Sequence, residues 1–536
     1  MLRHFRAKHE KPAPSVQAAV ESQGEGNRKE RIDEVLVSMI VKDSQPFSIV
    51  DDDGFKYLVS ILDPTYILPS RQTLKKMVDT KFTEEKEKAK EEVLRATGIS
   101  LTSDMWTTVH MDSYLAVTCH FVDSQDKLST VLLGVGQFSG SSTAANIAAV
   151  KTALMEEWGI RSKIRCLVTD AAANMIACAN ILQVRHTICI AHALNLVVIK
   201  AIDFPGFDEI RGRARKIVAY FRSSTVAKER LGTFQQQMGK PAHKLLQEVD
   251  TRWNSTYDML ARLYEQREPV GAALVSLMTD LPPLSSTEYQ SMSECLCVLS
   301  PLKEATVELS AEKTVSGSKV IPLIRMLRHV ITTNQQEVTD DKAAQLCTNL
   351  LGLMSERLCH YETASQMTLA TLLDPRFKTM GFCNPSYAQN AVKRLTAECA
   401  AKVRDTAAPN TTPEPAESSS AAADNPGTGL WDLLDQRVME TRKVKSATAN
   451  ATVEVQRYLS EPNITRSEDP LQFWAQHKHI YPHLYMLSLC YLCTPASSVP
   501  CEQVFSKAGE VVSKKRNRLS PSTVEKILFL NKNQTT

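Results

Sequence analysis

Three short runs of β-prone residues follow one another between Ile99 and Phe138, and they constrain the fold more than any other feature of the chain. Most of the remaining sequence has the apolar periodicity of helices. The three runs cover residues 99–106, 114–122 and 128–138, with polar turns between them. A helix is expected over 143–158, a fourth strand over 164–169, and a fifth strand over 187–190 that leads into another helix. This order of elements predicts an α/β core.

Two aspartates occupy informative positions in this predicted core. Three antiparallel-type strands followed by alternating helices and strands are the order of an RNase H-like fold. Asp104 lies on the first predicted strand and Asp170 lies at the end of the fourth. Phosphoryl transfer with two divalent cations needs carboxylates that converge from different elements, and magnesium prefers such oxygen ligands. A single aspartate at a strand end is more often structural, so the pair gains meaning only together with other motifs.

The rest of the chain is predicted to be mainly helical. Between Asp170 and Glu502 lie 331 residues, far more than the α/β core needs. Helices are predicted over residues 211–231, 256–277, 286–309, 320–333, 340–358 and 387–403. Residues 404–429 carry several prolines and a serine run without apolar periodicity, so we expect a disordered loop there. Residues 29–97 have a helical pattern of their own.

Composition narrows the class of protein. A chain of 536 residues is too long for one core, and two to four domains are expected. Hydrophobic residues make up 43% and charged residues 23%, as in ordinary globular proteins. No run approaches the roughly 18 apolar residues of a membrane span, so no membrane partner is expected. Thirteen cysteines, an odd number, suit reduced thiols inside a cell. The net charge of +3 requires any nucleic-acid surface to be a local patch.

Four motifs in the second part of the chain carry a family resemblance. Residues 497–509 read SSVPCEQVFSKAG, residues 189–192 read CIAH, residues 250–255 read DTRWNS, and residues 373–378 read LDPRFK. Together, and in this order, they resemble the hAT-type DNA transposases and their host-domesticated descendants, close to the BED zinc-finger proteins of vertebrates. The resemblance covers the chain from about residue 30 to residue 533.

The resemblance implies an RNase H-like core that is split by a large helical insertion, α/β plus all-α in class. The implied parts are residues 1–28, a remnant of a BED finger and a linker; 29–97, a helical N-terminal domain; 98–204, the first part of the core; 205–403, the helical insertion; 404–429, the disordered loop; and 430–536, a C-terminal hAT dimerisation region that completes the core.

The resemblance also implies functional residues. Glu502 corresponds to the third acid of the family's catalytic site, and with Asp104 and Asp170 it would hold magnesium ions if the protein is active. Arg252 and Trp253 correspond to a DNA-contacting phrase in which the tryptophan stacks on an extruded base. A buried core tryptophan is an equally good explanation of Trp253. For Cys189 and the following histidine, a buried thiol and a helix cap are at least as good an explanation as a metal site.

The first ten residues contain half of a zinc-finger pattern. His4 and His9 have the H-x4-H spacing of a Cys2His2 finger. Structural zinc needs four ligands, and the first cysteine of the chain is Cys119. We therefore expect no bound zinc, and a basic disordered tail is the simpler description of this segment.

The C-terminal region is predicted to have two further roles. Lys514, Lys515, Arg516 and Arg518 form a compact basic cluster that could contact phosphates or act as a nuclear import signal, although a solvated loop is the plainer explanation. Apolar residues nearby could pack against a second copy and form a homodimer. They are Leu519, Val524, Ile527, Leu528 and Leu530.

Two functions compete, together with a third that no residue supports. The first is a nuclear, dimeric DNA-binding protein, domesticated from an hAT transposase and acting in transcriptional regulation. The second is an active DDE-type transposase that cleaves and joins DNA with magnesium. All three acids favour the second, whereas the incomplete finger and Ala171, where the family commonly has asparagine after the second acid, favour the first. A SUMO-ligase-like activity, as attributed to some relatives, has no RING-type cysteine spacing to support it.

Overall fold

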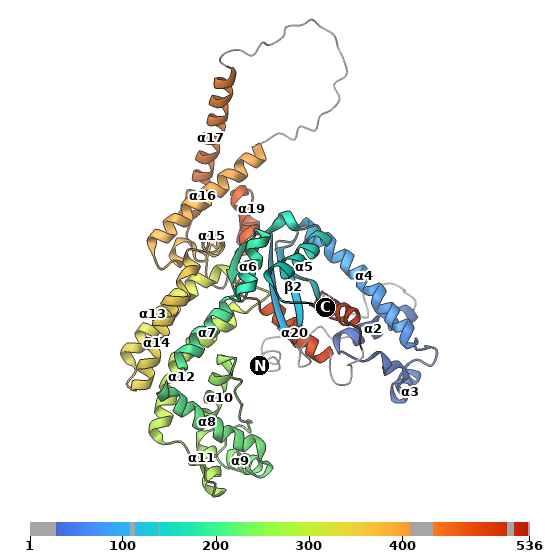
Figure 1. The fold of residues 1–536 in the computed structure, drawn as a ribbon, viewed down its shortest axis with the longest axis vertical. Coiled ribbons are helices and arrows are strands. Elements are labelled where there is room, and N and C mark those ends of the chain that lie inside the picture. Colours follow the sequence, from blue (N-terminus) through green and yellow to red (C-terminus); the bar gives the residue numbers. More distant parts are fainter. Residues whose placement is uncertain (1–27, 108–112, 139, 408–431, 512–518, 534–536) are drawn as a thin grey trace. The chain divides into compact units, whose positions relative to one another are not determined.

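A five-stranded mixed sheet lies at the centre of the fold. The computed structural model describes residues 28–107, 113–138, 140–407, 432–511 and 519–533 (Figure 1). The strands are β1 (Ile99–Thr107), β2 (Ser113–Val122), β3 (Leu128–Gln137), β4 (Ile164–Thr169) and β5 (Arg185–Ile188), in the order β3-β2-β1-β4-β5. The predicted α/β core is thus confirmed as a mixed sheet with many helices. The fifth strand begins two residues before its predicted start at 187.

Strand direction sets which residues meet at each edge of the sheet. β1 and β2 pair antiparallel, with Leu101 opposite Cys119, and β2 pairs with β3 in the same way. β1 and β4 pair parallel, with Thr102 opposite Val168, and β4 also pairs parallel with β5. Parallel neighbours need a crossover helix between them, and their carboxyl ends lie at the same edge of the sheet.

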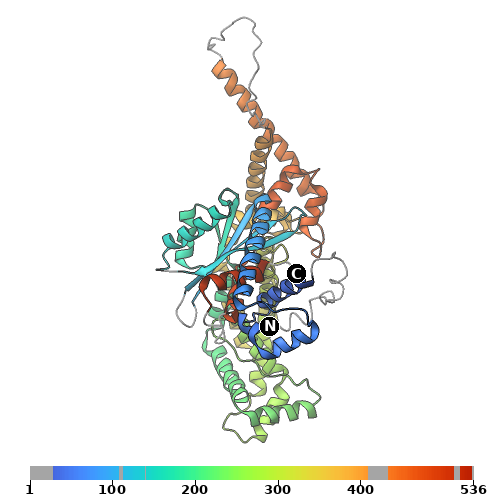
Figure 2. The same ribbon diagram turned by 90° about the vertical axis from the view of Figure 1, so that its right-hand side faces the viewer.

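Helices α5 (Ala144–Glu157) and α6 (Ala173–Leu182) form a layer on one face of the sheet. In Figure 2 these teal helices lie together on one side of the cyan strands. Thr143 caps α5, since its hydroxyl accepts the Asn146 amide. Leu154 of α5 lies against the backbone of Gly134, where a Cβ atom would come within 3.0 Å of it. The prediction did not include α6, which is one of the shorter helices.

Two predicted helices of the insertion are each two helices. Residues 211–231 were predicted as one helix, but α8 (Pro205–Ser223) ends before Ser224 and α9 (Thr225–Gln237) begins after it. Ser224 has an extended backbone, and its hydroxyl accepts the Ala227 amide as an N-cap. Likewise 256–277 contains α10 (Trp253–Glu265) and α11 (Arg267–Ser276), separated at Gln266. Apolar periodicity continues across both breaks, so it could not reveal them.

The remaining helices from Ile190 to Val511 vary widely in length. They are α7 (Ile190–Ile202), α12 (Ser286–Leu309), α13 (Val320–Glu337), α14 (Asp341–Arg357), α15 (Ser365–Leu373), α16 (Pro385–Ala407), α17 (Asp432–Ser460), α18 (Pro470–His477), α19 (Pro482–Tyr491) and α20 (Val499–Val511). α16 and α17 pack side by side (Figure 1). α16 continues to Ala407, past the predicted start of the loop at 404, and residues 408–431 lie outside the described part of the chain.

One continuous core joins the insertion helices to the segment before α20. The LDPRFK motif contributes a buried ion pair to this region. Arg376 donates to both carboxylate oxygens of Asp374, at 2.9 and 2.6 Å, and the Ser318 hydroxyl donates to the same group at 2.6 Å. Since Asp374 is fully buried, these three donors satisfy a charge that would otherwise be costly. The motif therefore has a structural role.

A second compact unit is formed by the two ends of the chain. Of the described residues, those up to Ala89 and those from Val504 onward form one unit, and those from Lys90 to Gln503 form the other. The first contains α2 (Arg28–Lys42), α3 (Asp53–Leu62), most of α4 (Arg71–Arg95), and α21 (Pro521–Asn533). Its small core includes Ile40, Leu74 and Leu530.

Helix α21 is buried within its own chain, which corrects one prediction. Val524, Ile527, Leu528 and Leu530 are at most 4% exposed. The Asn531 side chain donates to the carbonyl of Val41 at 3.0 Å in the same unit. These apolar residues therefore do not form an open face for a second copy, because α2 and α4 cover them.

No single helix among the described residues is long and apolar enough to cross a membrane. One bent pair, α7 with α8, reaches the required length and composition together, with a bend of 98° between its helices.

Candidate functional site

The parallel pairing of β1 with β4 brings the first two predicted acids to one edge of the sheet. Thr102 lies opposite Val168, so the same register continued by two residues places Asp104 level with Asp170. Asp104 accepts the amide of Met105 at 2.8 Å. Asp170 accepts the amide of Ala172 at 3.2 Å, in the turn that leads into α6.

The third acid, Glu502, lies in the first turn of α20. The thiol of the preceding residue, Cys501, lies 3.2 Å from the Thr102 hydroxyl and 3.7 Å from that of Thr118. Side chains two positions apart on a strand share a face, so Cys501 packs on the face that carries Asp104. The Glu502 side chain itself is exposed.

The three acids influence one another electrostatically. Burial, together with the carboxylates of Asp170 and Glu502, raises the pKa of Asp104 to about 7, although the Met105 amide and the Lys151 ammonium act to lower it. The structure thus gathers all three predicted acids from two strands and one distant helix.

The acids have the right chemistry for magnesium but not the spacing. Three carboxylates are hard oxygen donors of the kind that magnesium prefers. Within the described ranges, however, no three carboxyl, imidazole or thiol side chains are placed so that they could hold one metal ion. The residues as arranged do not fit a shared metal site, and magnesium binding remains a prediction.

The pKa of Asp104 predicts a specific dependence of stability on pH. Its usual value is 3.8 and its value in the fold is about 7. Below pH 4 the carboxyl is mainly protonated in both the folded and the unfolded chain, so burying it does not lower the free energy of unfolding. As pH rises through this window the unfolded chain ionises first, and stability falls. Asp104→Asn should therefore be more stable than the wild type above pH 7, by up to about 4 kcal/mol.

Thermal midpoints of the full chain in EDTA, measured from pH 4.5 to 8, test this expectation. The advantage of Asp104→Asn should shrink toward the acidic end of the series. Asp280→Asn, at an exposed loop aspartate, is the control and should show no such trend. An advantage that stays constant with pH would contradict the assignment.

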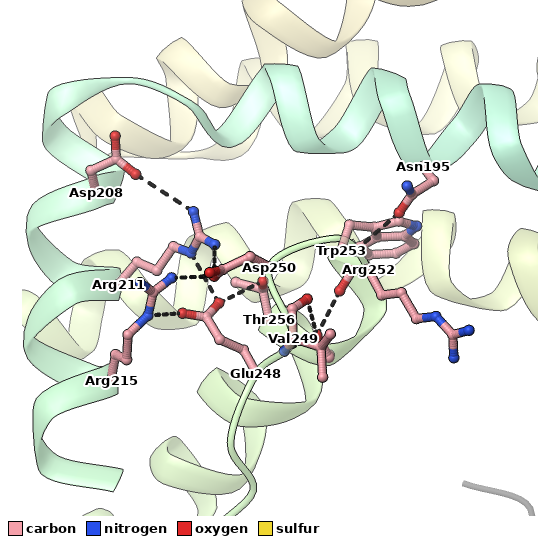
Figure 3. Close-up of polar contacts among 11 residues, drawn as sticks. Asn195, Asp208, Arg211, Arg215, Glu248, Val249, Asp250, Arg252, Trp253 and Thr256 are labelled. Carbon is pink, nitrogen blue, oxygen red and sulfur yellow. Dashed lines mark hydrogen bonds and ion pairs between the residues drawn. The ribbon is translucent and has the colours of Figure 1, made fainter. Parts of the chain in front are cut away.

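The Arg252–Trp253 turn is held by α7 (Figure 3). The Asn195 side chain accepts the Trp253 amide at 3.1 Å and donates to the Thr251 carbonyl at 3.1 Å. The Trp253 indole is only 2% exposed and contacts Tyr257 edge-on, at 6.4 Å between ring centroids. The structure therefore places Trp253 in the core, the second of the two explanations above, and stacking on a base would require this turn to move.

Arg252 has the opposite environment. Its side chain is exposed and points away from the neighbouring ionic cluster in Figure 3. No hydrogen bond or ion pair of its guanidinium occurs among the described residues. An arginine held by a rigid turn, with its charge free, is well suited to a phosphate contact.

The loop before this turn is fixed by a buried ionic cluster that the sequence did not predict (Figure 3). The Glu248 carboxylate accepts from Arg211 at 2.9 Å, from Thr256 at 2.7 Å, and from Arg215. Burial acts to raise the pKa of Glu248, but these donors outweigh it and the net pKa is lowered. Asp250 bridges the same two arginines at the surface.

Removal of Glu248 should destabilise the insertion strongly. Its side chain is 1% exposed, whereas that of Asp250 is 73% exposed. Breaking a buried pair by removing one partner costs about 3–5 kcal/mol, whereas an exposed pair contributes about 1 kcal/mol or less. Glu248→Ala should lower the urea midpoint, followed by tryptophan fluorescence, far more than Asp250→Ala. Equal shifts of the urea midpoint in the two variants would show that buried Glu248 stabilises the fold no more than exposed Asp250 does.

The other predicted site residues are placed as follows. Cys189 is fully buried, and its thiol accepts the Ser498 amide at 3.3 Å, so it has the structural role weighed above. His4 and His9 lie outside the described residues, as does the basic cluster of Lys514, Lys515, Arg516 and Arg518.

Three residues at or beside these sites were not predicted: Lys151, Asn195 and Glu248. Asn195 and Glu248 are ordinary polar residues in helical or loop sequence, and no local pattern marks their partners. Lys151 did carry a signal. It lies four residues after Ile147 and four before Met155, on the apolar face of the predicted helix 143–158, where a lysine is unexpected.

Comparison with known proteins agrees with this arrangement. Three family models match: the ZBED1 RNase-like domain over residues 102–194, the ZBED1 RNase-like helical domain over 187–298, and the hAT family C-terminal dimerisation region over 454–534. No model of a BED finger matches. The first covers the sheet with Asp104 and Asp170, and the last contains Glu502.

Among the similar proteins, some are named as transcriptional regulators and others are named as transposases. The chain is 28% identical to human zinc finger BED domain-containing protein 4 over 94% of its length, 27% identical to the maize "Putative AC transposase" over 91%, and 23% identical to the Talaromyces stipitatus "Putative transcriptional regulator tpeD" over 92%. It spans 43%, 63% and 61% of these relatives.

Proposed function

Because the chain is an hAT-transposase-related protein that resembles the zinc finger BED domain-containing proteins, we propose that it is a nuclear, self-associating DNA-binding protein that regulates transcription without cutting DNA. The observation that carries this proposal is the exposed, unpaired Arg252 on a turn clamped by Asn195. A relative of similar sequence that is named as a transcriptional regulator supports the same role.

The acid cluster supports a function without cleavage. Two-metal phosphoryl transfer requires ionised carboxylates that share metal ions. Among the described residues, no three acidic, imidazole or thiol side chains are placed so that they could hold one metal ion. The gathering of Asp104, Asp170 and Glu502 in one place keeps an active magnesium-dependent transposase as the second candidate.

DNA binding should be electrostatic and should leave the DNA intact. We expect affinity for duplex DNA to fall steeply with salt, since phosphate contacts release counterions. Arg252→Ala should weaken binding several-fold and reduce the salt slope by about one. Arg466→Ala, at an exposed arginine between α17 and α18, should change neither. Fluorescence anisotropy at several salt concentrations measures both quantities.

The same samples separate the two functions. After incubation with Mg²⁺, the proposed regulator should leave DNA ends and strands unchanged on a denaturing gel. Hairpin or strand-transfer products that disappear in Glu502→Gln would establish the active transposase instead. Sequence-selective binding that does not respond to salt would refute the electrostatic description.

Self-association is proposed to use α3 rather than α21. The dimerisation region includes α21, whose apolar face is already covered within the chain. In the same unit, α3 has no buried residue, and its Tyr57, Leu58, Ile61 and Leu62 are 53–70% exposed. Large apolar residues gathered in this way on a surface usually mark an interface, and a second copy is the occupant that a dimerisation region implies.

Charge on this face should therefore abolish self-association. Ile61→Glu combined with Leu62→Glu should convert a dimer to a monomer in light scattering coupled to gel filtration, because burying two carboxylates is unfavourable. Lys56→Glu, on the same helix, changes net charge by the same amount and should leave the dimer intact. A double variant that remains dimeric would assign the interface to another surface.

A further inference from the structure

Arg165 occupies an irregular place in the sheet. Ile99 of β1 pairs with Ile164 of β4. The next pair is Ser100 with Cys166, so Arg165 has no partner on β1 and forms a β-bulge. Bulges are rare between parallel strands, and they often re-aim a side chain beside a functional site. Because β4 lies between two parallel neighbours, where residues are usually apolar, an arginine on its bulge calls for an explanation.

A cavity of about 330 Å³ lies beside this bulge. It is at the amino ends of β4 and β5, whereas Asp170 of the acid cluster follows the carboxyl end of β4. Residues of α16 and α19, which pack against each other, line the cavity as well. Its volume is within the range of sites that hold small ligands. The cavity is therefore a candidate binding site that is separate from the acids.

Charged side chains line this cavity, and one of them has no ionic partner. The Arg185 guanidinium donates to the Glu398 carboxylate at 3.0 Å. The Lys402 ammonium lies 3.7 Å from the carboxylate of Asp405, three residues further along α16. The lining thus has three cations and two acids, which form two pairs. Among the described residues, Arg165 is left without a carboxylate.

The guanidinium of Arg165 is partly buried and lacks a strong acceptor. Its Nε is buried and has no hydrogen-bond partner in the described part of the chain. The Cys490 thiol of α19 is a neighbour, since Arg165 acts to lower the pKa of this thiol, which burial raises. A thiol is only a weak acceptor. The terminal nitrogens of Arg165 have no oxygen acceptor among the described residues and are not buried, so a ligand can reach them.

The unpaired guanidinium indicates the chemical class of the ligand. Its planar fork donates two parallel hydrogen bonds to an oxyanion. Arg185 and Lys402 add positive charge from β5 and α16, so the cations converge from three elements. Such convergence fits a tetrahedral anion better than a planar carboxylate. We propose that the cavity binds a small oxyanion of the phosphate class, held by Arg165 and supported by Lys402.

The two acids of the lining limit the expected affinity. Glu398 and Asp405 repel an anion, but each lies next to its own cation. Three cations and two acids leave a net charge of one positive unit. Because the cavity is partly open to water, this charge attracts an anion only moderately. We therefore expect a dissociation constant for inorganic phosphate in the millimolar range.

Calorimetric titration of the full chain with inorganic phosphate tests the proposal, at an ionic strength held constant with chloride. Binding should be saturable. Arg165→Met, which keeps most of the side-chain volume and loses the charge, should weaken it at least about tenfold. Arg161→Met is the matched control, because Arg161 is an exposed arginine four residues earlier that does not line the cavity. Its phosphate affinity should equal that of the wild type.

Two further measurements test the ligand class and guard against misfolding. Acetate, a planar oxyanion, should bind several-fold more weakly than phosphate. If Arg165→Met does not fold, Lys402→Met takes its place, since it removes a cation from α16 without changing the sheet. Lys402→Met should also weaken phosphate binding.

Several outcomes would overturn the proposal. Phosphate binding by the wild type that does not saturate at millimolar concentrations would show that the cavity is not an anion site. Equal phosphate affinity in Arg165→Met and the wild type would place any binding elsewhere. Acetate that binds as tightly as phosphate would refute the tetrahedral class.

Duplex DNA is a different source of phosphate and is tested separately by fluorescence anisotropy. Arg165→Met should bind DNA as the wild type does, because the proposed ligand is small and the cavity is distinct from the Arg252 turn. A loss of DNA binding in Arg165→Met without a change in phosphate affinity would assign Arg165 to a DNA-binding surface and overturn the proposal. Failure of Arg252→Ala to alter DNA binding would leave the phosphate result intact.

Discussion

The acid cluster depends on the parallel pairing of β1 with β4. Asp104 and Asp170 are 66 positions apart, and the crossover through α5 is what allows two strands to run in the same direction as neighbours. Once Thr102 is opposite Val168, the continued register leaves the two acids no freedom to separate. One pairing thus determines the position of two carboxylates.

The return of the chain to complete the site depends on a different set of contacts. Residues 496–501 are held by backbone and thiol hydrogen bonds, not by charge. The Ile190 amide donates to the Ala496 carbonyl at 3.0 Å, and the Ser498 amide donates to the Cys189 thiol. Cys501 then fills the space between the threonines of β1 and β2. The CIAH and SSVPCE motifs, which are more than three hundred residues apart, are therefore two halves of one junction that orients Glu502.

Sequence reasoning predicted what local pattern can encode. β-branched runs marked all five strands of the sheet. Helix breaks at Ser224 and Gln266 were missed because neither residue interrupts apolar periodicity, and α21 was expected to face a second copy because periodicity shows an apolar face without showing what covers it. Contacts between distant polar residues, such as Glu248 with two arginines of α8, leave no local trace.

Lys151 shows how a departure from pattern can be more informative than agreement with it. Its position on the apolar face of α5 is a local inconsistency, and natural sequences concentrate such inconsistencies at functional sites. Ala171 is a second departure, because it has no polar side chain, and among the described residues the Asp170 carboxylate accepts from the backbone amide of Ala172. The proposed contact with DNA depends in turn on a residue that follows no such pattern, because Arg252 is exposed on a turn that Asn195 of α7 holds in place.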